Sequence, residues 1–352
     1  MLHNIYYTSH DGVNTIHACL WMPEGEVKGI FQIVHGMSEY AARYSPFAEF
    51  LASNGYMVCA EDHLGHGETA KDEDALGYFD ENHDYRTVLK DIRHLGVRVR
   101  ANHPDAPYFI LGHSMGSFLV RAFLAEYPDD KITGAVIMGT GFQGKGLINT
   151  AIFMTNMNAF FRGWTNRSGF IKSLAFGSYN KKWGGKGFEW LSVNEDNVRA
   201  YDADPLCGFP FTDNGYSVLF HSIKAACSKK TFKKTPGKLP IYIVSGDQDP
   251  VGGYGKQVKK VCKMYMKTGH DSVAVKLYKG ARHEILNDFT RDEARADILE
   301  FINGLTEAHY AAKTAVKPAD KPADKPADKP ADKPADKPAD KPAEKPEEKP
   351  AE

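Results

Sequence analysis

The sequence lacks the features that mark membrane-spanning and secreted proteins. Its 352 residues contain no uncharged apolar run of about 18 or more, so no segment is long enough for a spanning helix. The first 25 residues have no basic start, no continuous apolar stretch and no small-residue cleavage site of the kind found in signal peptides. We therefore expect a cytoplasmic protein.

The sequence also has few cysteines and a net charge close to zero. The five cysteines are scattered, odd in number and without a C-x-x-C pair, which favours free thiols in a reducing compartment. The 44 basic and 45 acidic residues nearly cancel, so no overall field attracts nucleic acid, an anionic membrane or a strongly charged substrate. We predict no nucleic-acid partner and at most a peripheral membrane contact through the cap described below. One local basic cluster is interpreted as a solvated linker: Lys229, Lys230, Lys233 and Lys234.

A change of composition near residue 310 divides the chain. From Lys317 onward the sequence repeats Lys-Pro-Ala-Asp and then drifts to Lys-Pro-Ala-Glu and Lys-Pro-Glu-Glu. Proline at every fourth position removes helix donors, and nothing apolar larger than alanine is present to bury. We predict that residues 311–352 are a disordered tail that acts as a solubilising spacer, with a tether to a partner or surface as the alternative.

The chain up to residue 310 alternates β-rich runs with helical stretches, which predicts an α/β fold with a mostly parallel sheet. With 42% hydrophobic residues, the chain can bury one large core or two modest ones. Eight strands are predicted, the second of them antiparallel and half exposed: 5–8, 14–21, 29–34, 57–61, 108–111, 134–138, 241–245 and 272–278. Five flanking helices are predicted: 45–53, 85–100, 114–126, 255–267 and 291–304.

The spacing of these elements is interrupted once, between the strands that end near residue 138 and begin at 241. We predict a mostly helical cap over residues 141–235, inserted between two parts of the core, 1–140 and 236–310. The insertion begins with apolar residues that share one helical face: Leu147, Ala151, Met154, Met157 and Phe161. The aromatic residues of this segment either line an acyl-chain pocket or pack the cap onto the core, and the sequence leaves both open.

The chemistry is concentrated in the segment FILGHSMGS, residues 109–117, where a predicted strand runs into G-x-S-x-G and then a helix. This pattern is typical of a nucleophile elbow, whose turn is so tight that Gly112 and Gly116 have no room for side chains. The elbow projects the serine above the sheet, at the positive end of the following helix. Ser114 is therefore the predicted nucleophile.

A serine hydroxyl needs a general base, and the base needs an acid that fixes its tautomer. The strand at 241–245 runs directly into two carboxylates, of which we choose Asp249 as the acid and keep Asp247 as the alternative. His283 follows the last predicted strand by five residues and is the predicted base. Residues of these types in the order serine, acid, histidine predict a catalytic triad.

An oxyanion hole requires two backbone N–H donors near the nucleophile. Met115, directly after the serine, supplies the first, and Met37, in the loop after the strand at 29–34, is predicted to supply the second. His35 in that loop is interpreted as structural. Asp62, His63 and His66 suggest a metal site, but the segment is a glycine-rich turn without a third clear ligand, so we predict no metal.

These motifs together carry a family resemblance. The runs HGMSEYAARY at 35–44, DHLGHG at 62–67, GHSMG at 112–116 and GARHE at 280–284 resemble the monoacylglycerol lipase and lysophospholipase branch of the α/β-hydrolases. The resemblance covers about residues 10 to 305. It implies the α/β-hydrolase fold and a cofactor-free enzyme, whose cap forms an acyl-chain tunnel and which cleaves single-chain esters such as monoacylglycerols or lysophospholipids. The repeat tail lies outside the shared pattern.

Alternative functions remain open on the sequence. An aminopeptidase would use the same triad with an acidic pocket for the substrate amine, for which Glu39 or a cap carboxylate could serve. A small-ester or thioester hydrolase, or an acyl transferase, differs only in leaving group or acceptor. A non-catalytic binding protein is disfavoured because all the triad and oxyanion positions are occupied by suitable residues.

Overall fold

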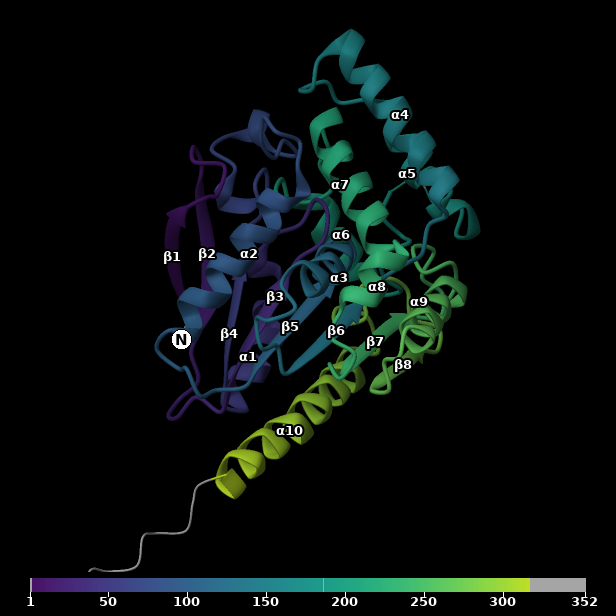
Figure 1. Ribbon diagram of the computed structural model, residues 1–352. Coiled ribbons are helices and arrows are strands. Elements are labelled where there is room, and N and C mark those ends of the chain that lie inside the picture. The colour runs from purple at the N-terminus through teal and green to yellow at the C-terminus, as the bar shows by residue number, and fades with distance from the viewer. Residues whose placement is uncertain (1, 186, 317–352) are drawn as a thin grey trace, which may run out of the picture.

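The fold is built on one large twisted sheet (Figure 1). The computed structural model describes residues 2–185 and 187–316, so the predicted repeat tail from residue 317 lies outside the described residues. Eight strands pair in the order β1-β2-β4-β3-β5-β6-β7-β8. Their bounds are β1 Leu2–Thr8, β2 Thr15–Trp21, β3 Gly29–Val34, β4 Tyr56–Glu61, β5 Tyr108–His113, β6 Gly134–Met138, β7 Ile241–Gly246 and β8 Val273–Tyr278.

The pairing of the strands confirms the predicted mostly parallel sheet. The strands from β4 to β8 pair in parallel, whereas β2 is antiparallel to both β1 and β4. The central strands β3, β4, β5 and β6 are buried along their whole length, which explains their nearly continuous apolar sequences. The predicted half exposure of β2 was wrong, because helix α1 and residues 67–69 pack against that strand and bury most of it.

Helices cover both faces of the sheet. The flanking helices are α1 Ser45–Ser53, α2 Tyr85–Arg100, α3 Met115–Glu126, α9 Lys256–Lys267 and α10 Arg291–Val316. Alternate residues of β3 enter two different apolar clusters, with Ile30 in one and Phe31 in the other. This alternation places one core on each face of the sheet. None of the described helices is both long and apolar enough to cross a membrane.

The last helix is longer than the sequence predicted. Its predicted end was Gly304, but α10 continues to Val316, so residues 311–316, which we had assigned to the tail, are helical. An internal glycine costs a helix only about 1 kcal/mol, and the alanine-rich segment that follows favours the helix.

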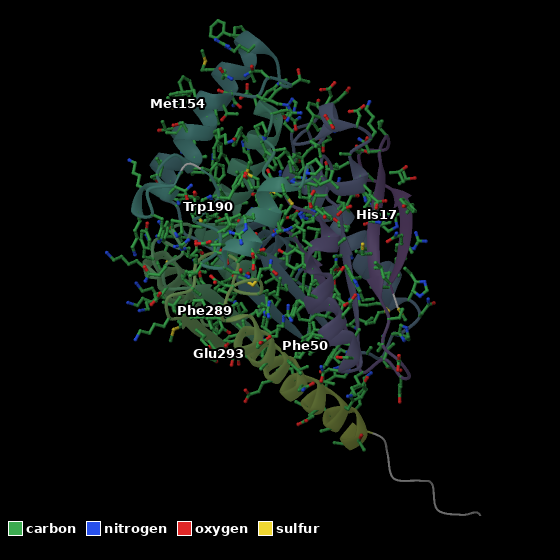
Figure 2. All side chains as sticks on the ribbon, turned by 180° about the vertical axis from the view of Figure 1, so that it is seen from behind. His17, Phe50, Met154, Trp190, Phe289 and Glu293 are labelled. Atoms are coloured by element: carbon green, nitrogen blue, oxygen red, sulfur yellow. The ribbon has the colours of Figure 1, made fainter. Side chains whose placement is uncertain are left out.

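The insertion between β6 and β7 is mostly helical. Its helices are α4 Lys145–Arg162, α5 Gly169–Phe176, α6 Glu195–Ala203, α7 Asp213–Ala226 and α8 Lys229–Lys234. Helix α7 packs against both α3 of the core and α4, and so joins the insertion to the body of the protein. Figure 2, seen from behind, shows Trp190 near the middle of the molecule and Met154 on the outlying α4.

Two details of the insertion differ from prediction. The apolar face identified in the sequence is not the buried face of α4, since Ala151 is buried but Leu147, Met157 and Phe161 are 61%, 40% and 74% exposed. The buried face consists of smaller residues that allow close packing on α7: Ile148, Ala151, Ile152, Thr155 and Ala159. The lysine cluster is not a linker but helix α8, capped by Ser228 and anchored by the buried Thr231 and Phe232.

A single buried side chain ties the start of the insertion and the end of α7 to the core. The guanidinium of Arg121 on α3 donates to the carbonyl of Gly141 at 2.9 Å, where the insertion begins. It also donates to the carbonyl of Ala226 at 2.8 Å, at the end of α7. The start of the insertion and the end of α7 therefore meet at one point on α3.

Candidate active site

Ser114 lies at the turn between β5 and α3, in the geometry of a nucleophile elbow. Its backbone has φ 54° and ψ −117°, a conformation that L-residues rarely adopt and that neighbouring structure must enforce. The N–H of Ser114 donates to the carbonyl of Met138 at 3.0 Å. A Cβ on Gly112 would collide with the carbonyl of Gly116, and one on Gly116 would collide with the β3 loop, so both predicted glycines are required sterically.

Asp249 and His283 meet at the carboxyl edge of the sheet, in the loops after β7 and β8. The imidazole Nδ1 of His283 lies 3.0 Å from Oδ2 of Asp249, with the ring turned somewhat away from linear alignment. Its Nε2 has no hydrogen-bond partner among the described residues, and both His283 and Ser114 line the same cavity. The structure thus brings the three predicted triad residues to one site.

The carboxylate of Asp249 is completely buried and held by several donors. The hydroxyl of Ser245 donates to Oδ2 at 2.9 Å, and the N–H of Val251 donates to Oδ1 at 2.8 Å. Burial raises the pKa of Asp249, but the facing imidazole of His283 and these hydrogen bonds outweigh it and hold the pKa below its ordinary value. The carboxylate is therefore ionised and oriented toward the imidazole.

The alternative acid, Asp247, bonds to other residues than the histidine. Its Oδ1 accepts hydrogen bonds from the N–H of Gly280 and the amide of Gln248, each at 2.8 Å. The bond from Gly280 joins the loops after β7 and β8. The geometry therefore favours Asp249 over Asp247 as the partner of the histidine.

The two predicted oxyanion donors have N–H groups that are free among the described residues. Neither the N–H of Met37 nor that of Met115 donates a hydrogen bond within the described part of the chain. The loop carrying Met37 packs tightly on the elbow, since a Cβ on Gly36 would lie only 3.0 Å from Cβ of Ser114. Ser38, at φ 54°, donates to the carbonyl of Phe209, which ties this loop to the cap.

The sequence did not predict a buried charged network beside the triad. Arg43 donates to Glu39 at 2.8 Å and forms two hydrogen bonds of 3.0 Å with Glu284, the neighbour of His283. Glu39 also accepts from Tyr44 at 2.9 Å and contacts Nδ1 of His113 at 3.0 Å. The spacing of Glu39 and Arg43, i and i+4, is a weak signal of pairing, but nothing in the sequence indicates Glu284 as the third member.

Opposite charges in this network hold one another ionised. Burial raises the pKa of Glu39, but the hydrogen bond and charge of His113 and the charge of Arg43 hold it well below the ordinary range. Burial lowers the pKa of His113, yet its contact with Glu39 raises it above its ordinary value overall. The charge of Glu39 is thus compensated before any substrate arrives.

The histidines of the early loops are structural. Nε2 of His35 accepts from the N–H of His63 at 3.0 Å, and burial followed by the charge of His63 lowers the pKa of His35 to about 3. Oδ2 of Asp62 contacts Nδ1 of His17 at 2.8 Å, and Oδ1 accepts from the N–H of Ala41 at 2.7 Å. Among residues 2–185 and 187–316, no group of three or more His, Cys, Asp or Glu side chains is arranged to hold a metal ion.

A buried acid next to this loop provides a test of stability. Glu61 ends β4, accepts from the hydroxyl of Tyr7 at 2.5 Å, and has a pKa raised well above its ordinary value by burial and by the charge of Asp91. Below the unfolded-state pKa the carboxyl is protonated in both states. Above it only the unfolded chain ionises, so stability falls as pH rises toward the folded-state pKa.

We expect Glu61→Gln to remove this decrease of folding stability with rising pH. From about pH 5 upward, the variant should gain stability relative to the parent by up to about 1.4 kcal/mol per pH unit, measured by urea unfolding. Glu49→Gln, at an exposed position of α1, serves as the control and should leave the pH dependence unchanged. Parallel pH curves for the parent and Glu61→Gln would contradict the assignment.

A cavity of about 620 Å³ opens onto Ser114 and His283, within the range of small-molecule sites. Its walls come from the oxyanion loop and from the insertion. Polar members of the walls include Glu39, Lys172, Asn180 and Asp202. The apolar members are Met37, Phe176, Phe188, Trp190, Leu191, Phe209 and Tyr216. The ring of Trp190 lies 5.0 Å from that of His283. The more outward aromatics, such as Phe153 and Phe160, are exposed and line no part of this cavity.

The sheet order, the elbow at the end of β5 and the cap inserted after β6 define an α/β-hydrolase. The chain belongs to the family described as "Serine aminopeptidase, S33", whose model matches residues 25–290, and within it to the monoacylglycerol lipase and lysophospholipase branch. This agrees with the resemblance in the sequence motifs. The enzyme class is that of carboxylic-ester hydrolases.

Three similar proteins illustrate this membership. A monoacylglycerol lipase of Mycolicibacterium smegmatis is 25% identical over 287 residues, 80% of this chain and 91% of that protein. A probable lysophospholipase L2 of Haemophilus influenzae is 24% identical over 305 residues, 85% of this chain and 90% of that protein. The crystal structure of a carboxyl esterase from Bacillus coagulans in complex with glycerol is 30% identical with a TM-score of 0.81, covering 87% of this chain and 99% of the esterase.

Proposed function

We propose that this protein hydrolyses carboxylic esters of single-chain lipids through an acyl-enzyme on Ser114. The observation that carries the proposal is the apolar cavity that ends at Ser114 and His283. A hydrocarbon chain gains about 0.8 kcal/mol for each CH₂ that it buries, so such a cavity favours an acyl chain over a polar substrate.

In the proposed mechanism His283 takes the proton of the Ser114 hydroxyl through Nε2 as the oxygen attacks the ester carbonyl. Asp249, on the Nδ1 side of the ring, holds the tautomer and stabilises the imidazolium. The N–H groups of Met37 and Met115 stabilise the negative oxygen of the tetrahedral intermediate. His283 then protonates the leaving alcohol. In the second half of the reaction His283 takes a proton from water, which attacks the acyl-enzyme, and then returns a proton to Ser114.

A monoacylglycerol or a lysophospholipid is the substrate class that we propose. The similar monoacylglycerol lipase and lysophospholipase are named for these substrates, and the similar carboxyl esterase was crystallised with glycerol, the alcohol that a monoacylglycerol would release. Five unpaired cysteines support a reducing location, and we propose the cytoplasm.

We expect kcat/KM for p-nitrophenyl esters to rise from two-carbon to medium acyl chains, by at most about fourfold for each methylene buried. The assay uses soluble substrates below their aggregation limit, which separates chain recognition from surface effects. Proline and alanine anilides, tested in parallel, should be cleaved poorly. A flat profile across chain lengths would favour a small-ester hydrolase, and faster cleavage of the anilides would favour an aminopeptidase.

The aminopeptidase alternative needs a free carboxylate to receive the substrate amine. Glu39, the candidate from the sequence, lines the cavity, but its oxygens are engaged by Arg43, Tyr44 and His113. Asp202 of the cap is the remaining candidate, and it is exposed at the cavity edge. The ester substrate is therefore the better fit to the buried part of the site.

We also propose that the cap makes peripheral contact with a lipid surface. Its support is the set of exposed apolar side chains on α4 and α5: Leu147, Phe153, Phe160, Phe161 and Phe170. Exposed aromatics next to a lipid-binding cavity favour shallow insertion among acyl chains.

A further inference from the structure

Helices α8 and α9 form a strongly basic surface on the side of the molecule that also carries α4 (Figure 1). Neither helix contains an aspartate or a glutamate. Their lysines are all exposed, as are one on α7 and one in the loop before β7. We call this set the lysine face: Lys224, Lys229, Lys230, Lys233, Lys234, Lys238, Lys256, Lys259, Lys260, Lys263 and Lys267.

The lysine face is unneutralised within the described part of the chain. None of its members forms an ion pair with any residue in the ranges 2–185 and 187–316. By contrast, Lys276 and Lys313 elsewhere on the surface do pair with aspartates at 2.6 Å. Like charges gathered in this way repel one another, and an anionic partner would relieve that repulsion.

We propose that the lysine face docks the protein on an anionic lipid bilayer. The face is extended: α9 alone is about 18 Å long at 1.5 Å per residue, well beyond the Debye length of about 8 Å in physiological salt. A single phosphate group reaches one or two lysines, whereas a bilayer surface reaches many at once. Each lysine near such a surface contributes to binding, and the contributions add.

The composition of the face favours a bilayer over nucleic acid. All its cations are lysines, and neither α8 nor α9 carries an arginine. Arginine is the residue that forms paired hydrogen bonds with base edges and with phosphates. Met266 on α9 is 59% exposed among the lysines, and helix α4, which carries exposed aromatics, lies on the same side of the molecule (Figure 1). Apolar groups beside a cationic face suit a lipid interface.

The test measures co-sedimentation of the full chain with two kinds of vesicle, phosphatidylcholine alone and phosphatidylcholine with about 30 mol% phosphatidylglycerol. We expect binding to the anionic vesicles to be the stronger, and to be lost as salt is raised to about 500 mM. The triple variant Lys230→Gln, Lys259→Gln, Lys263→Gln should reduce partitioning onto anionic vesicles on the order of 100-fold. Binding to neutral vesicles, which reports the exposed apolar side chains of α4 and α5, should not change.

The matched control is Lys71→Gln, Lys90→Gln, Lys279→Gln, three exposed lysines outside the face, and it should bind as the parent does. Both triple variants should retain turnover of a soluble ester, and the Ser114→Ala chain should still bind vesicles, so this test is independent of the proposed chemistry. Equal binding by the two triple variants would overturn the proposal. So would tighter binding to duplex RNA or DNA than to anionic vesicles at the same salt concentration.

Discussion

Replacement of Ser114 by alanine is expected to lower kcat/KM for a soluble ester on the order of 10⁴-fold or more, without loss of the fold. The methyl group keeps the volume of the elbow but removes the only atom that can form the acyl-enzyme. His283→Ala and Asp249→Ala should cause losses of similar kind. The double variants should lose little more, because the three residues act as a unit.

Ser173→Ala is the matched control for this experiment. Ser173 lines the same cavity, but it lies on α5 of the cap, away from the edge of the sheet. Its variant should keep turnover within about twofold of the parent, as expected for a surface substitution. An alkyl fluorophosphonate should label the parent and Ser173→Ala but not Ser114→Ala. Retention of more than about a tenth of the parent turnover by Ser114→Ala would refute the assignment.

The second large effect is expected from Gly116→Ala. A Cβ at this position would collide with the carbonyl oxygen of Val34 and lie 2.6 Å from that of His35, and neither can move without displacing β3. We expect the free energy of unfolding to fall by at least about 3 kcal/mol. Turnover should fall as well, since a displacement of about 1 Å at the reacting atom costs about 100-fold.

Gly146→Ala provides the control for this steric argument. Gly146 lies within α4, and a Cβ there would meet nothing within 4 Å. Alanine should therefore leave stability unchanged or raise it by up to about 1 kcal/mol, because glycine is the poorer helix former. Urea unfolding of the two variants and the parent measures both effects. A Gly116→Ala protein as stable as the parent would show that the elbow tolerates a side chain.

The contrast between these sites shows which features local sequence can predict. The elbow has a signature of five consecutive residues, so Gly112, Ser114 and Gly116 could be placed from the pattern alone, although the atoms that exclude a side chain at Gly116 belong to β3 and its loop. The charged network could not, because Arg43 and Glu284 are 241 positions apart and meet only through folding. Its existence depends on how two loops approach each other, which no short motif encodes.

The buried face of helix α4 could not be identified from the sequence for a different reason. Apolar residues occur all round this helix, so periodicity offers more than one candidate face. The outcome was decided by α7, against which small and β-branched side chains pack more closely than aromatic ones. The end of α10 likewise depended on a balance of about 1 kcal/mol at Gly304, which tertiary context easily reverses.

Arg121 has a consequence for how the cap can diversify. Its guanidinium holds Gly141, where the insertion begins, beside Ala226 at the end of α7, so these two points of the cap share one buried anchor on α3. Helix α4, which packs on α7, can therefore change in length while β6 and β7 stay in place, whereas residues 189–192 of the cap bond to Arg282 and Glu284 on either side of His283. New substrate preferences can therefore arise through changes in the outer cap helices while the catalytic residues at the edge of the sheet stay the same.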